Sequence, residues 1–469
     1  MLHSKDTVNQ QEIKTVLLIG LGRIGLPQAL ILANSGITVY GFDHNASIMQ
    51  EFDKGQLPFY EPNMETYLRN SLNKTFHPIA SWEKVTHYLS LIDAVFFVVG
   101  TQAPNAESVC QSETFDLSAY FVLLDKLFSD KKRIKKGIKL IIRTTLPLGG
   151  TDRLKEHIET QHGLMEGQDF YFAFVPERII EGNALEELKT IPKIIGVYSD
   201  EAFHPIQLLF KKIGGKVMRV RNPITAEFCK LTDNSFRSTV FSYANEIALH
   251  AHHFNINVNE VIKTVNDGYK RNHIPKPGFV SGYCLSKDPY IFELGFLKNH
   301  KRNFQSVWYY GCKANAYLIQ FAVDHVLKNI KEAEHSVVAI LGLSFKEEVD
   351  DFRMAHPFSI IEKLVENKLC NFKVYDPNLD KNKYTQIPEH LCKYIRYKSN
   401  VLDEKVLDQV DALIIATQHH SLVKMNTHTL LTQLVRNTKK PCYVFDGYAI
   451  WDQIKSIPNI RYESITKHN

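Results

Sequence analysis

A short apolar strand followed by a glycine-rich turn and a helix, close to the start of the chain, constrains the fold more than any other feature. Residues 15–20 read TVLLIG, which is too short for a helix, and a G-x-G-x-x-G turn at residues 20–25 leads into a helical stretch. A second strand, at residues 38–43, ends in Asp43, at about the 20-residue offset where a carboxylate can bind the ribose of a dinucleotide. We therefore expect a β-α-β unit that binds a dinucleotide, with an ordinary structural turn as the alternative.

The residues of this turn have separate roles in such a site. The first glycine makes the tight turn, the second lets the backbone approach a pyrophosphate, and the third lets the helix pack on the strand. The helix N-terminus stabilises the phosphate charge. Because a carboxylate at position 43 repels a 2′-phosphate, the predicted cofactor is NAD and not NADP; Arg23 either contacts the phosphate or is solvated. The cofactor-binding residues predicted here are Gly20, Gly22, Arg23, Ile24, Gly25 and Asp43.

Strand and helix patterns alternate in the first and last parts of the chain, whereas only helical spacing occurs between residues 225 and 330. Such alternation implies doubly wound parallel sheets. We predict an α/β protein with two Rossmann-like doubly wound domains, joined by an all-α central domain with a long helix at residues 307–330. The predicted domains are residues 1–218, 219–332 and 333–469. Further strands are expected at residues 94–99, 140–143, 171–175, 337–342, 372–376, 412–417 and 443–446.

Composition and charge exclude several classes of protein. With 44% hydrophobic and 23% charged residues over 469 positions, the chain is expected to be globular. The formal charge of +5 is small and spread along the chain, so no nucleic-acid partner is expected. The seven cysteines lack metal-binding spacing, so we expect reduced thiols in a cytoplasmic protein and no metal site. The polar N-terminus predicts no signal peptide, and no apolar run reaches the roughly 20 residues of a membrane span.

One cysteine has neighbours that indicate a catalytic role. Cys284 follows the loop sequence PGFVSGY, and Lys287 and Asp288 come three and four residues later. Glycine and proline favour an accessible loop, and a nearby cation raises the fraction of nucleophilic thiolate. The alternative is a buried, inert cysteine, which is the usual state of a lone cysteine.

Two further groups of polar residues could serve the same site. Lys230 and Asn234 are i and i+4 on a predicted helix, so both side chains leave one face and could stabilise an oxyanion. A solvated helix face is the alternative for this pair. Glu177 and Glu181 follow a predicted strand, at the end where parallel sheets bind ligands, although surface charges in a loop give the same pattern.

Together these segments resemble the UDP-glucose, UDP-N-acetylhexosamine and GDP-mannose 6-dehydrogenase family. The resemblance runs from about residue 15 to residue 452, nearly the whole chain, with the motifs in the family's order. Each motif alone is weak, but their joint order is specific. Besides the segments above, those that carry it are Pro58-Phe-Tyr-Glu61-Pro62, Thr144-Thr145-Leu-Pro147, Asn245-Glu246, Gly342-Leu-Ser-Phe345-Lys346, Asp350-Asp351-Phe-Arg353 and Tyr375-Asp376-Pro377.

The resemblance implies an NAD-dependent, four-electron oxidation of a sugar CH2OH group to a carboxylate. The Cys284 thiolate would add to an aldehyde intermediate, and Lys230 and Asn234 would stabilise the resulting oxyanion. A second oxidation would leave a thioester, which water activated by Asp288 would hydrolyse. The implied catalytic residues are Cys284, Lys230, Asn234 and Asp288, with Glu177 and Thr145 assisting the water.

The resemblance also implies contacts beyond the glycine turn, a C-terminal domain that binds the nucleotide sugar, and a homodimer built on the central helices. Arg271 resembles an arginine that reaches the substrate from the partner subunit. The further cofactor residues implied are Thr101, Thr145, Glu181, Lys287 and Arg353. The implied substrate residues are Glu177, Arg178, Lys230, Asn234, Arg271, Phe279, Gly282, Phe345, Lys346 and Tyr448.

Several positions depart from the family pattern. The stretch before Cys284 is one residue shorter than usual, with Ser281 in place of a glycine. Tyr448 stands where the family generally has a substrate-binding arginine. Tyr448 therefore either contacts a different sugar or packs at the domain edge.

The residue after Glu177 bears on the substrate. Arg178 at this position resembles the branch of the family that uses N-acetylhexosamine nucleotides, so UDP-GlcNAc or UDP-ManNAc is favoured over UDP-glucose. Two rival functions remain: a two-electron NAD dehydrogenase without covalent catalysis, and a non-catalytic nucleotide-sugar binding protein. The number of NADH molecules formed per product distinguishes the three functions: two for the four-electron oxidation, one for the two-electron dehydrogenase and none for the binding protein.

Overall fold

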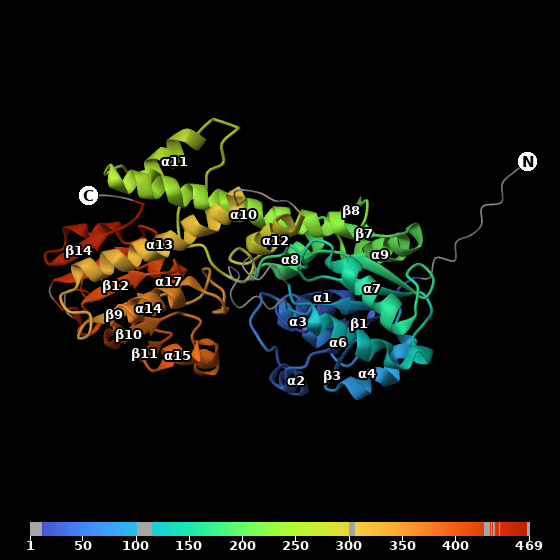
Figure 1. Ribbon diagram of the computed structural model, residues 1–469. Coiled ribbons are helices and arrows are strands. Elements are labelled where there is room, and N and C mark those ends of the chain that lie inside the picture. The colour runs from blue at the N-terminus through green and yellow to red at the C-terminus, as the bar shows by residue number, and fades with distance from the viewer. Residues whose placement is uncertain are drawn as a thin grey trace, which may run out of the picture. The chain divides into compact units, whose positions relative to one another are not determined.

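The computed structural model of the protein describes residues 12–100, 115–299, 305–425 and 441–466, with residues 432, 434 and 437–439 between the last two ranges. The chain divides into two compact units (Figure 1). The first contains Met1–Asp233 and Leu294–Lys301, and the second contains Asn234–Glu293 and Arg302–Asn469. Each unit has its own sheet and its own hydrophobic core.

The first unit is built on an eight-stranded sheet. Its strands are β1 (Thr15–Ile19), β2 (Thr38–Phe42), β3 (Phe76–Ile79), β4 (Ala94–Phe97), β5 (Ile138–Ile142), β6 (Phe170–Phe174), β7 (Lys193–Val197) and β8 (Val217–Val220). Their order is β3-β2-β1-β4-β5-β6-β7-β8, and all neighbours are parallel except β6 and β7. Every residue of β4 and β5 is buried, as expected of parallel strands covered on both faces. The order reverses between β1 and β4, and open α/β sheets bind ligands at such a point.

Helices cover this sheet. They are α1 (Gly25–Asn34), α2 (Ala46–Asp53), α3 (Met64–Ser71), α4 (Trp82–Tyr88), α6 (Ser118–Leu127), α7 (Gly150–His162), α8 (Ala184–Thr190) and α9 (Asp200–Ile213), with 3₁₀ turns η1 (Leu89–Leu91) and η2 (Phe128–Arg133). Nine of the ten residues of α1 are buried, because this helix packs between the sheet and its neighbours α3 and α8. The close packing holds the N-terminus of α1 at the end of β1, where the glycine turn lies.

The second unit is built on a six-stranded, all-parallel sheet. Its strands are β9 (Val337–Leu341), β10 (Asn371–Tyr375), β11 (Ile395–Ser399), β12 (Ala412–Ile415), β13 (Cys442–Asp446) and β14 (Ile460–Glu463). They lie in the order β11-β10-β9-β12-β13-β14. The order again reverses next to the first strand of the sheet, between β9 and β12. The second sheet thus repeats the plan of the first.

Helices of very different lengths precede and connect the strands of the second sheet. Two of them cross the division between the units in the sequence, α10 (Pro223–His253) and α12 (Asp288–Asn299). The others are α11 (Val258–Asn266), α13 (Val307–Asn329), α14 (His356–Glu366), α15 (Glu389–Cys392), α16 (Glu404–Leu407) and α17 (His420–Val423), with 3₁₀ turns η3 (Lys381–Gln386) and η4 (Asp452–Ser456). Helix α13 packs against α14 and β13 (Figure 1).

The predicted fold class is confirmed: two α/β sheets, parallel except between β6 and β7, precede and follow in the sequence a region that is helical at every element described between residues 223 and 329. The predicted helix at residues 307–330 is α13. The three domain boundaries stay predictions, since the division into compact units falls inside α10. Among the described helices, none is both long enough and apolar enough to span a bilayer.

Candidate active site

The glycine turn leaves one side of its backbone open. Gly20 has a φ of +100°, and a Cβ there would lie 2.4 Å from the carbonyl oxygen of Val98. A Cβ on Gly25 would lie 1.8 Å from the carbonyl oxygen of Gly20, so close packing requires glycine at both positions. A Cβ on Gly22, in contrast, would meet no described atom within 4 Å. The chain therefore offers open backbone at the position where a pyrophosphate would lie, and these residues fit the predicted cofactor.

Asp43 ties the second strand to this turn. Its carboxylate accepts hydrogen bonds from the backbone N–H of Leu21, at 2.7 Å, and of Asn45, at 2.8 Å. The side chain is buried. A carboxylate oxygen accepts more than one hydrogen bond, so Asp43 keeps acceptor capacity for a ribose hydroxyl.

Arg23 packs within the first unit and is not solvated. Its side chain is only 10% exposed, with one guanidinium nitrogen 3.8 Å from Oε2 of Glu181. The guanidinium carbon lies 4.8 Å from the centre of the Phe59 ring. The structure thus brings two of the predicted cofactor residues together beside the glycine turn. Ile24 caps α1 and packs on the core, whereas Thr101 lies outside the described residues.

Glu177, just beyond the end of β6, is enclosed by cations. It forms an ion pair with Arg143, and Nζ of Lys193 lies 3.8 Å from its Oε1. Burial raises the pKa of Glu177, but the charges of Arg143 and Lys193 outweigh it and hold the pKa below the usual range. Burial also lowers the pKa of Lys193, to about 8. Glu177 is therefore a fixed, ionised carboxylate.

Lys230 reaches the same strand end from α10. Its Nζ donates a hydrogen bond of 2.8 Å to the backbone oxygen of Glu177, and its side chain is buried. One turn earlier, the carboxylate of Glu227 accepts hydrogen bonds of 2.7 Å from the backbone N–H of Gly149 and of Thr151. These contacts fix the start of α10 within the first unit.

The remaining predicted residues of the first unit occupy neighbouring strand ends. Thr145 is buried in the loop that follows β5. Arg178 donates a hydrogen bond of 2.7 Å to the backbone oxygen of Pro192. Because β5 and β6 are parallel neighbours, Thr145 and Glu177 follow strands whose carboxyl ends lie at the same edge of the sheet.

The second unit holds the predicted nucleophile. Cys284 is exposed, and the adjoining Asp288 begins α12 with no exposed side-chain surface. The Asp288 carboxylate accepts a hydrogen bond of 2.6 Å from Nζ of Lys287 through one oxygen and another of 2.6 Å from Nδ2 of Asn234 through the other. Burial lowers the pKa of Lys287, but the charges of Asp288 and Cys284 outweigh it and raise the pKa. The Lys287 charge thus interacts with both Asp288 and Cys284.

Two of the other described cysteines are of a different kind. Cys312 and Cys442 are buried, and burial raises the pKa of Cys312 to about 11 and that of Cys442 to about 12. Cys370 is exposed, like Cys284, but its thiol lies against the backbone oxygen of Lys368. The buried, inert alternative fits these first two thiols and does not fit Cys284.

Tyr283 is a residue of this cluster that the sequence did not single out. Nζ of Lys287 lies 4.9 Å, and the guanidinium carbon of Arg353 5.6 Å, from the centre of its ring. Arg353 is held in turn by a hydrogen bond of 2.8 Å from its Nε to Asp351. Two predicted cofactor residues that are far apart in the chain are therefore neighbours of the residue next to Cys284.

The loop before Cys284 packs against residues that follow β9 in the chain. A Cβ on Gly282 would lie 2.5 Å from the Phe345 ring, so this glycine lets the loop pass close to the ring. The Phe279 ring stacks on His356, with centroids 4.9 Å apart. Burial lowers the pKa of His356 to about 4, so the ring is neutral and Nδ1 accepts a hydrogen bond of 2.8 Å from Ser281. The serine that replaces a family glycine is thus a structural contact.

Tyr448 also packs against this loop. Its hydroxyl donates a hydrogen bond of 3.2 Å to the backbone oxygen of Ala416, and a Cβ on Gly278 would lie 2.8 Å from its ring. Packing therefore accounts for Tyr448, and its contact with a sugar stays a prediction. Lys346 is partly exposed, and Arg271 is exposed with its guanidinium carbon 4.6 Å from the centre of the Tyr269 ring.

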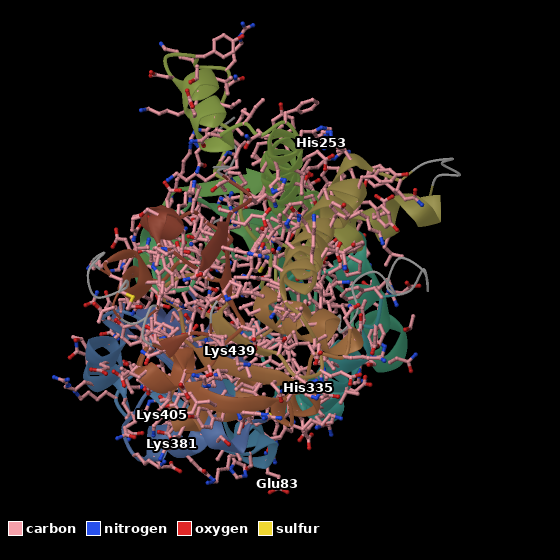
Figure 2. The ribbon with its side chains drawn as sticks, turned by 90° about the vertical axis from the view of Figure 1, so that its left-hand side faces the viewer. Glu83, His253, His335, Lys381, Lys405 and Lys439 are labelled. Atoms are coloured by element: carbon pink, nitrogen blue, oxygen red, sulfur yellow. The ribbon has the colours of Figure 1, made fainter. Side chains whose placement is uncertain are left out.

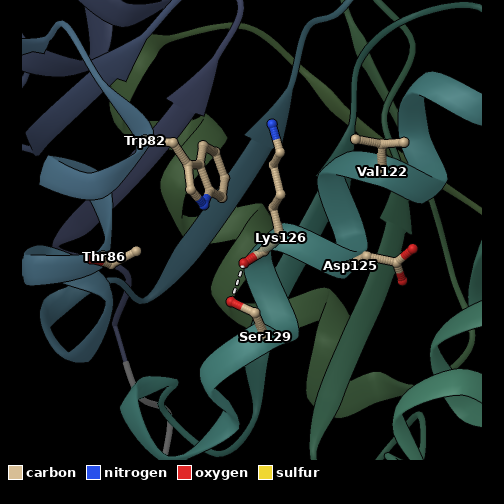
Figure 3. A pocket seen from close by; sticks show the side chains of 6 residues that line it. All are labelled: Trp82, Thr86, Val122, Asp125, Lys126 and Ser129. Atoms are coloured by element: carbon tan, nitrogen blue, oxygen red, sulfur yellow. Dashed lines mark hydrogen bonds between the residues drawn. The ribbon is translucent and has the colours of Figure 1, made fainter.

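The first unit also contains a pocket whose lining residues are separate from the predicted site residues. It is lined by Trp82 and Thr86 of α4, Val122, Asp125 and Lys126 of α6, and Ser129 of η2 (Figure 3). None of these six side chains is a predicted site residue. We assign the pocket no part in catalysis.

Sequence reasoning missed Arg143 and Lys193 in the first unit. Arg143 has no exposed side-chain surface and Lys193 only 1%. Both are charged residues within or directly after apolar strand runs, IIRTT and PKIIGV. Because charges are rarely buried unless paired, these runs carried a signal that a buried carboxylate must exist.

An open glycine turn with a carboxylate just after the second strand is typical of a dinucleotide-binding domain, and the exposed thiol beside a buried lysine and aspartate is a candidate nucleophile. Family models of the UDP-glucose/GDP-mannose dehydrogenase family match residues 14–214 as the NAD binding domain, 224–305 as the central domain and 339–453 as the UDP binding domain. The chain belongs to this family. The predictions of the family, of NAD and of a nucleotide-sugar dehydrogenase are confirmed.

Individual relatives match along most of their length. The UDP-N-acetyl-D-mannosamine dehydrogenase of Pyrococcus horikoshii is 30% identical over 422 residues, 88% of this chain and 92% of that protein. That of Campylobacter jejuni is 28% identical over 436 residues, 90% of this chain and 99% of that protein. The solved structure of UDP-D-ManNAc dehydrogenase from Pyrococcus horikoshii matches with a TM-score of 0.80 and 29% identity, over 97% of this chain and 99% of that one.

Proposed function

We propose that this enzyme oxidises the C6 alcohol of a UDP-N-acetylhexosamine to the uronic acid through a thioester on Cys284. The observation that carries the proposal is the exposed Cys284 thiol next to the buried Lys287–Asp288 pair. Relatives named UDP-N-acetyl-D-mannosamine dehydrogenase support the sugar, as does Arg178 after Glu177. UDP-ManNAc is the first substrate to test.

The chain's own residues supply the chemistry around the reacting carbon. Two molecules of NAD, bound one after the other at the glycine turn, would each accept one hydride. Between them the Cys284 sulfur bonds to the aldehyde carbon, and Lys230 and Asn234 stabilise the negative charge that moves to the oxygen. Loss of the second hydride leaves a thioester. Asp288 then takes a proton from water, whose oxygen bonds to the carbon as the carbon–sulfur bond breaks and the thiolate leaves.

Glu177 and Thr145 have supporting roles in this proposal: Thr145 would assist the water that Asp288 activates. Because the Glu177 carboxylate is already paired with Arg143 and Lys193, its part is to hold the strand end whose backbone oxygen receives Lys230. The hydrogen bonds of Asp288 similarly hold Asn234 and Lys287 in place. A preorganised donor stabilises developing charge without reorganising at the moment of reaction.

The stoichiometry of the reaction tests this proposal. Purified protein would be incubated with NAD and, separately, UDP-ManNAc, UDP-GlcNAc, UDP-glucose or GDP-mannose, and NADH and acid would be counted. We expect two NADH per acid with a UDP-N-acetylhexosamine. One NADH per aldehyde product would establish a two-electron enzyme, and no NADH with any of the four sugars would overturn the proposal.

Asp43 predicts a strong preference for NAD. A 2′-phosphate would face this buried carboxylate, so kcat/KM for NADP should be at least about a hundredfold lower. The matched variant is Asp43→Asn, which keeps an oxygen acceptor for the Leu21 N–H but removes the charge. We expect the preference to shrink about tenfold or more in this variant. Equal kcat/KM for both cofactors in the wild type would contradict the assignment.

We also propose a homodimer, because exposed aromatic residues line the central helices. Phe236 and Tyr243, seven residues apart on α10, are 66% and 57% exposed. Tyr310 and Tyr317, seven residues apart on α13, are also exposed. A spacing of seven places residues on one helix face, and exposed apolar patches mark protein interfaces. A second copy of the chain, carrying Arg271 toward its neighbour's substrate, is the proposed occupant.

Negative charges introduced on the exposed face of α10 should prevent the subunits from associating. We expect the double variant Phe236→Glu, Tyr243→Glu to elute as a monomer in size-exclusion chromatography with light scattering, because the carboxylates would be buried against apolar partners. Val401→Glu, at an exposed apolar position of the last sheet region, is the control and should stay dimeric. A double variant with the wild-type mass would show that this face is not the interface.

The cytoplasmic location stays a proposal. The six described cysteines form no disulfide, which suits a reducing compartment.

A further inference from the structure

Two histidines and a glutamate from three elements of the second unit converge on one point. His252 lies near the end of α10, His325 in α13 and Glu463 at the end of β14. Nε2 of His252 and Nδ1 of His325 each lie 2.9 Å from Oε1 of Glu463. The three atoms all lie within 4.8 Å of one another. Nothing in the proposed catalysis uses this cluster.

The cluster is held in place by its surroundings. The side chains are 15% exposed at His252 and 21% at both His325 and Glu463. The second carboxylate oxygen of Glu463 accepts a hydrogen bond of 2.6 Å from the hydroxyl of Tyr443. The Phe321 ring packs against both imidazoles, with centroids 4.8 Å from His252 and 4.1 Å from His325. Such outer contacts orient the ligands of metal sites in proteins.

We propose that His252, His325 and Glu463 bind one divalent transition-metal ion, with Zn²⁺ the best match. Two imidazole nitrogens and one carboxylate oxygen are a ligand set of zinc, and a water molecule completes four-coordination. Metal–ligand distances of about 2.0–2.1 Å place neighbouring ligands of a tetrahedral site about 3.3 Å apart. The two nitrogen–oxygen separations of 2.9 Å need only a few tenths of an ångström of widening, and the two imidazole nitrogens lie within 4.8 Å of each other. This revises the expectation, drawn from cysteine spacing, that the chain has no metal site.

The ion would cross-link three elements of the second unit. It would join the ends of two long helices, α10 and α13, to the last strand of the sheet. Because ligands from three elements must come together for binding, the ion stabilises the folded unit in proportion to its affinity. The role is structural and separate from hydride transfer.

A second group in the chain provides an internal comparison. Asp125, His157 and His162 also bring three ligand atoms within 4.8 Å of one another. There Asp125 is 50% exposed and both histidines come from α7, so fewer elements fix the geometry. We therefore expect the first group to bind more tightly.

The test is a titration of chelator-treated, full-length protein with Zn²⁺ by calorimetry and with Co²⁺ by visible absorption. We expect one tight ion per chain and the ligand-field bands of Co²⁺ with nitrogen and oxygen ligands. His325→Asn should abolish both, as should Glu463→Gln, which preserves size and the hydrogen bond from Tyr443. The controls are His157→Asn and His253→Asn; His253 is the exposed neighbour of His252 on α10 (Figure 2). Both controls should bind like the wild type.

Thermal unfolding gives an independent readout. Zn²⁺ at about 100 times its dissociation constant should raise the wild-type Tm by about 5 °C, and should leave His325→Asn and Glu463→Gln unchanged. Circular dichroism of the metal-free variants checks that they are folded. The proposal is overturned by a wild type that binds no stoichiometric ion, by undiminished binding in both variants, or by loss of binding only in His157→Asn. NADH stoichiometry depends on neither result, so the two proposals fail separately.

Discussion

Replacement of Cys284 by alanine is expected to reduce acid formation by about a thousandfold or more, because no other described side chain beside Asp288 offers a thiolate. Without the sulfur, an aldehyde formed in the first oxidation has no covalent partner, and the second hydride cannot leave from a thiohemiacetal. The fold should be unchanged, because the side chain is exposed. Acid formation is measured by mass spectrometry and NADH by absorbance.

Two further variants sharpen this prediction. Cys370→Ala removes the other exposed thiol among the described residues and should retain wild-type turnover. Cys284→Ser should form an oxygen ester, which hydrolyses more slowly than a thioester and is detectable as added mass on the intact protein. Wild-type turnover in Cys284→Ala would rule out the thioester mechanism.

Replacement of Arg143 by methionine is expected to lower the free energy of unfolding of the first unit by about 3–5 kcal/mol. Arg143 is fully buried, and its loss leaves the Glu177 carboxylate with Lys193, 3.8 Å away, and with a hydrogen bond of 2.8 Å from the backbone N–H of Arg178. The flanking hydrogen bond of 3.0 Å from Nε of Arg143 to Gln28 is lost as well. Urea unfolding measures the change. The control Arg133→Met breaks an exposed ion pair with Asp130 and should cost about 0–1 kcal/mol.

The pH dependence of this loss has a definite sign. In the wild type the pKa of Glu177 is held below its usual 4.5, so its contribution to stability is present above pH 4.5 and is lost as the pH falls. Without Arg143 the burial of Glu177 favours the protonated form, so the variant loses stability as the pH rises through 4.5. The difference between variant and wild type should therefore be largest near pH 7 and smaller at pH 4. A difference independent of pH would show that Glu177 is not the partner whose charge matters.

The sequence predicted well those elements that are determined by interactions between residues close together in the chain. The glycine turn requires residues without side chains where strand and helix pass closely, so Gly20 and Gly25 are visible in the sequence itself. The alternation of apolar strands and helices likewise predicted two parallel sheets. In contrast, the antiparallel pairing of β6 with β7 depends on the path of the chain, and no local pattern indicates it.

The parts of the site that sequence did not predict arise from contacts between distant segments. Lys193 pairs with Glu177 only because β7 lies beside β6. Lys287 and Arg353 both lie over the Tyr283 ring only because the loop before Cys284 packs against residues that follow β9. His252, His325 and Glu463 are separated by up to 211 positions, so no spacing rule applies to them. Residue types alone could not select these partners.

Helix α10 also restricts how the chain can change in length. Asn234, which binds Asp288, and His252, which meets Glu463, lie 18 positions apart on it (252 − 234), about five turns or 27 Å. Both contacts need the same face, so inserting one residue between them would rotate one contact about 100° away from its partner. Homologous chains that keep both contacts should therefore keep the length of the segment between residues 234 and 252, whereas insertions should gather in the surface loops.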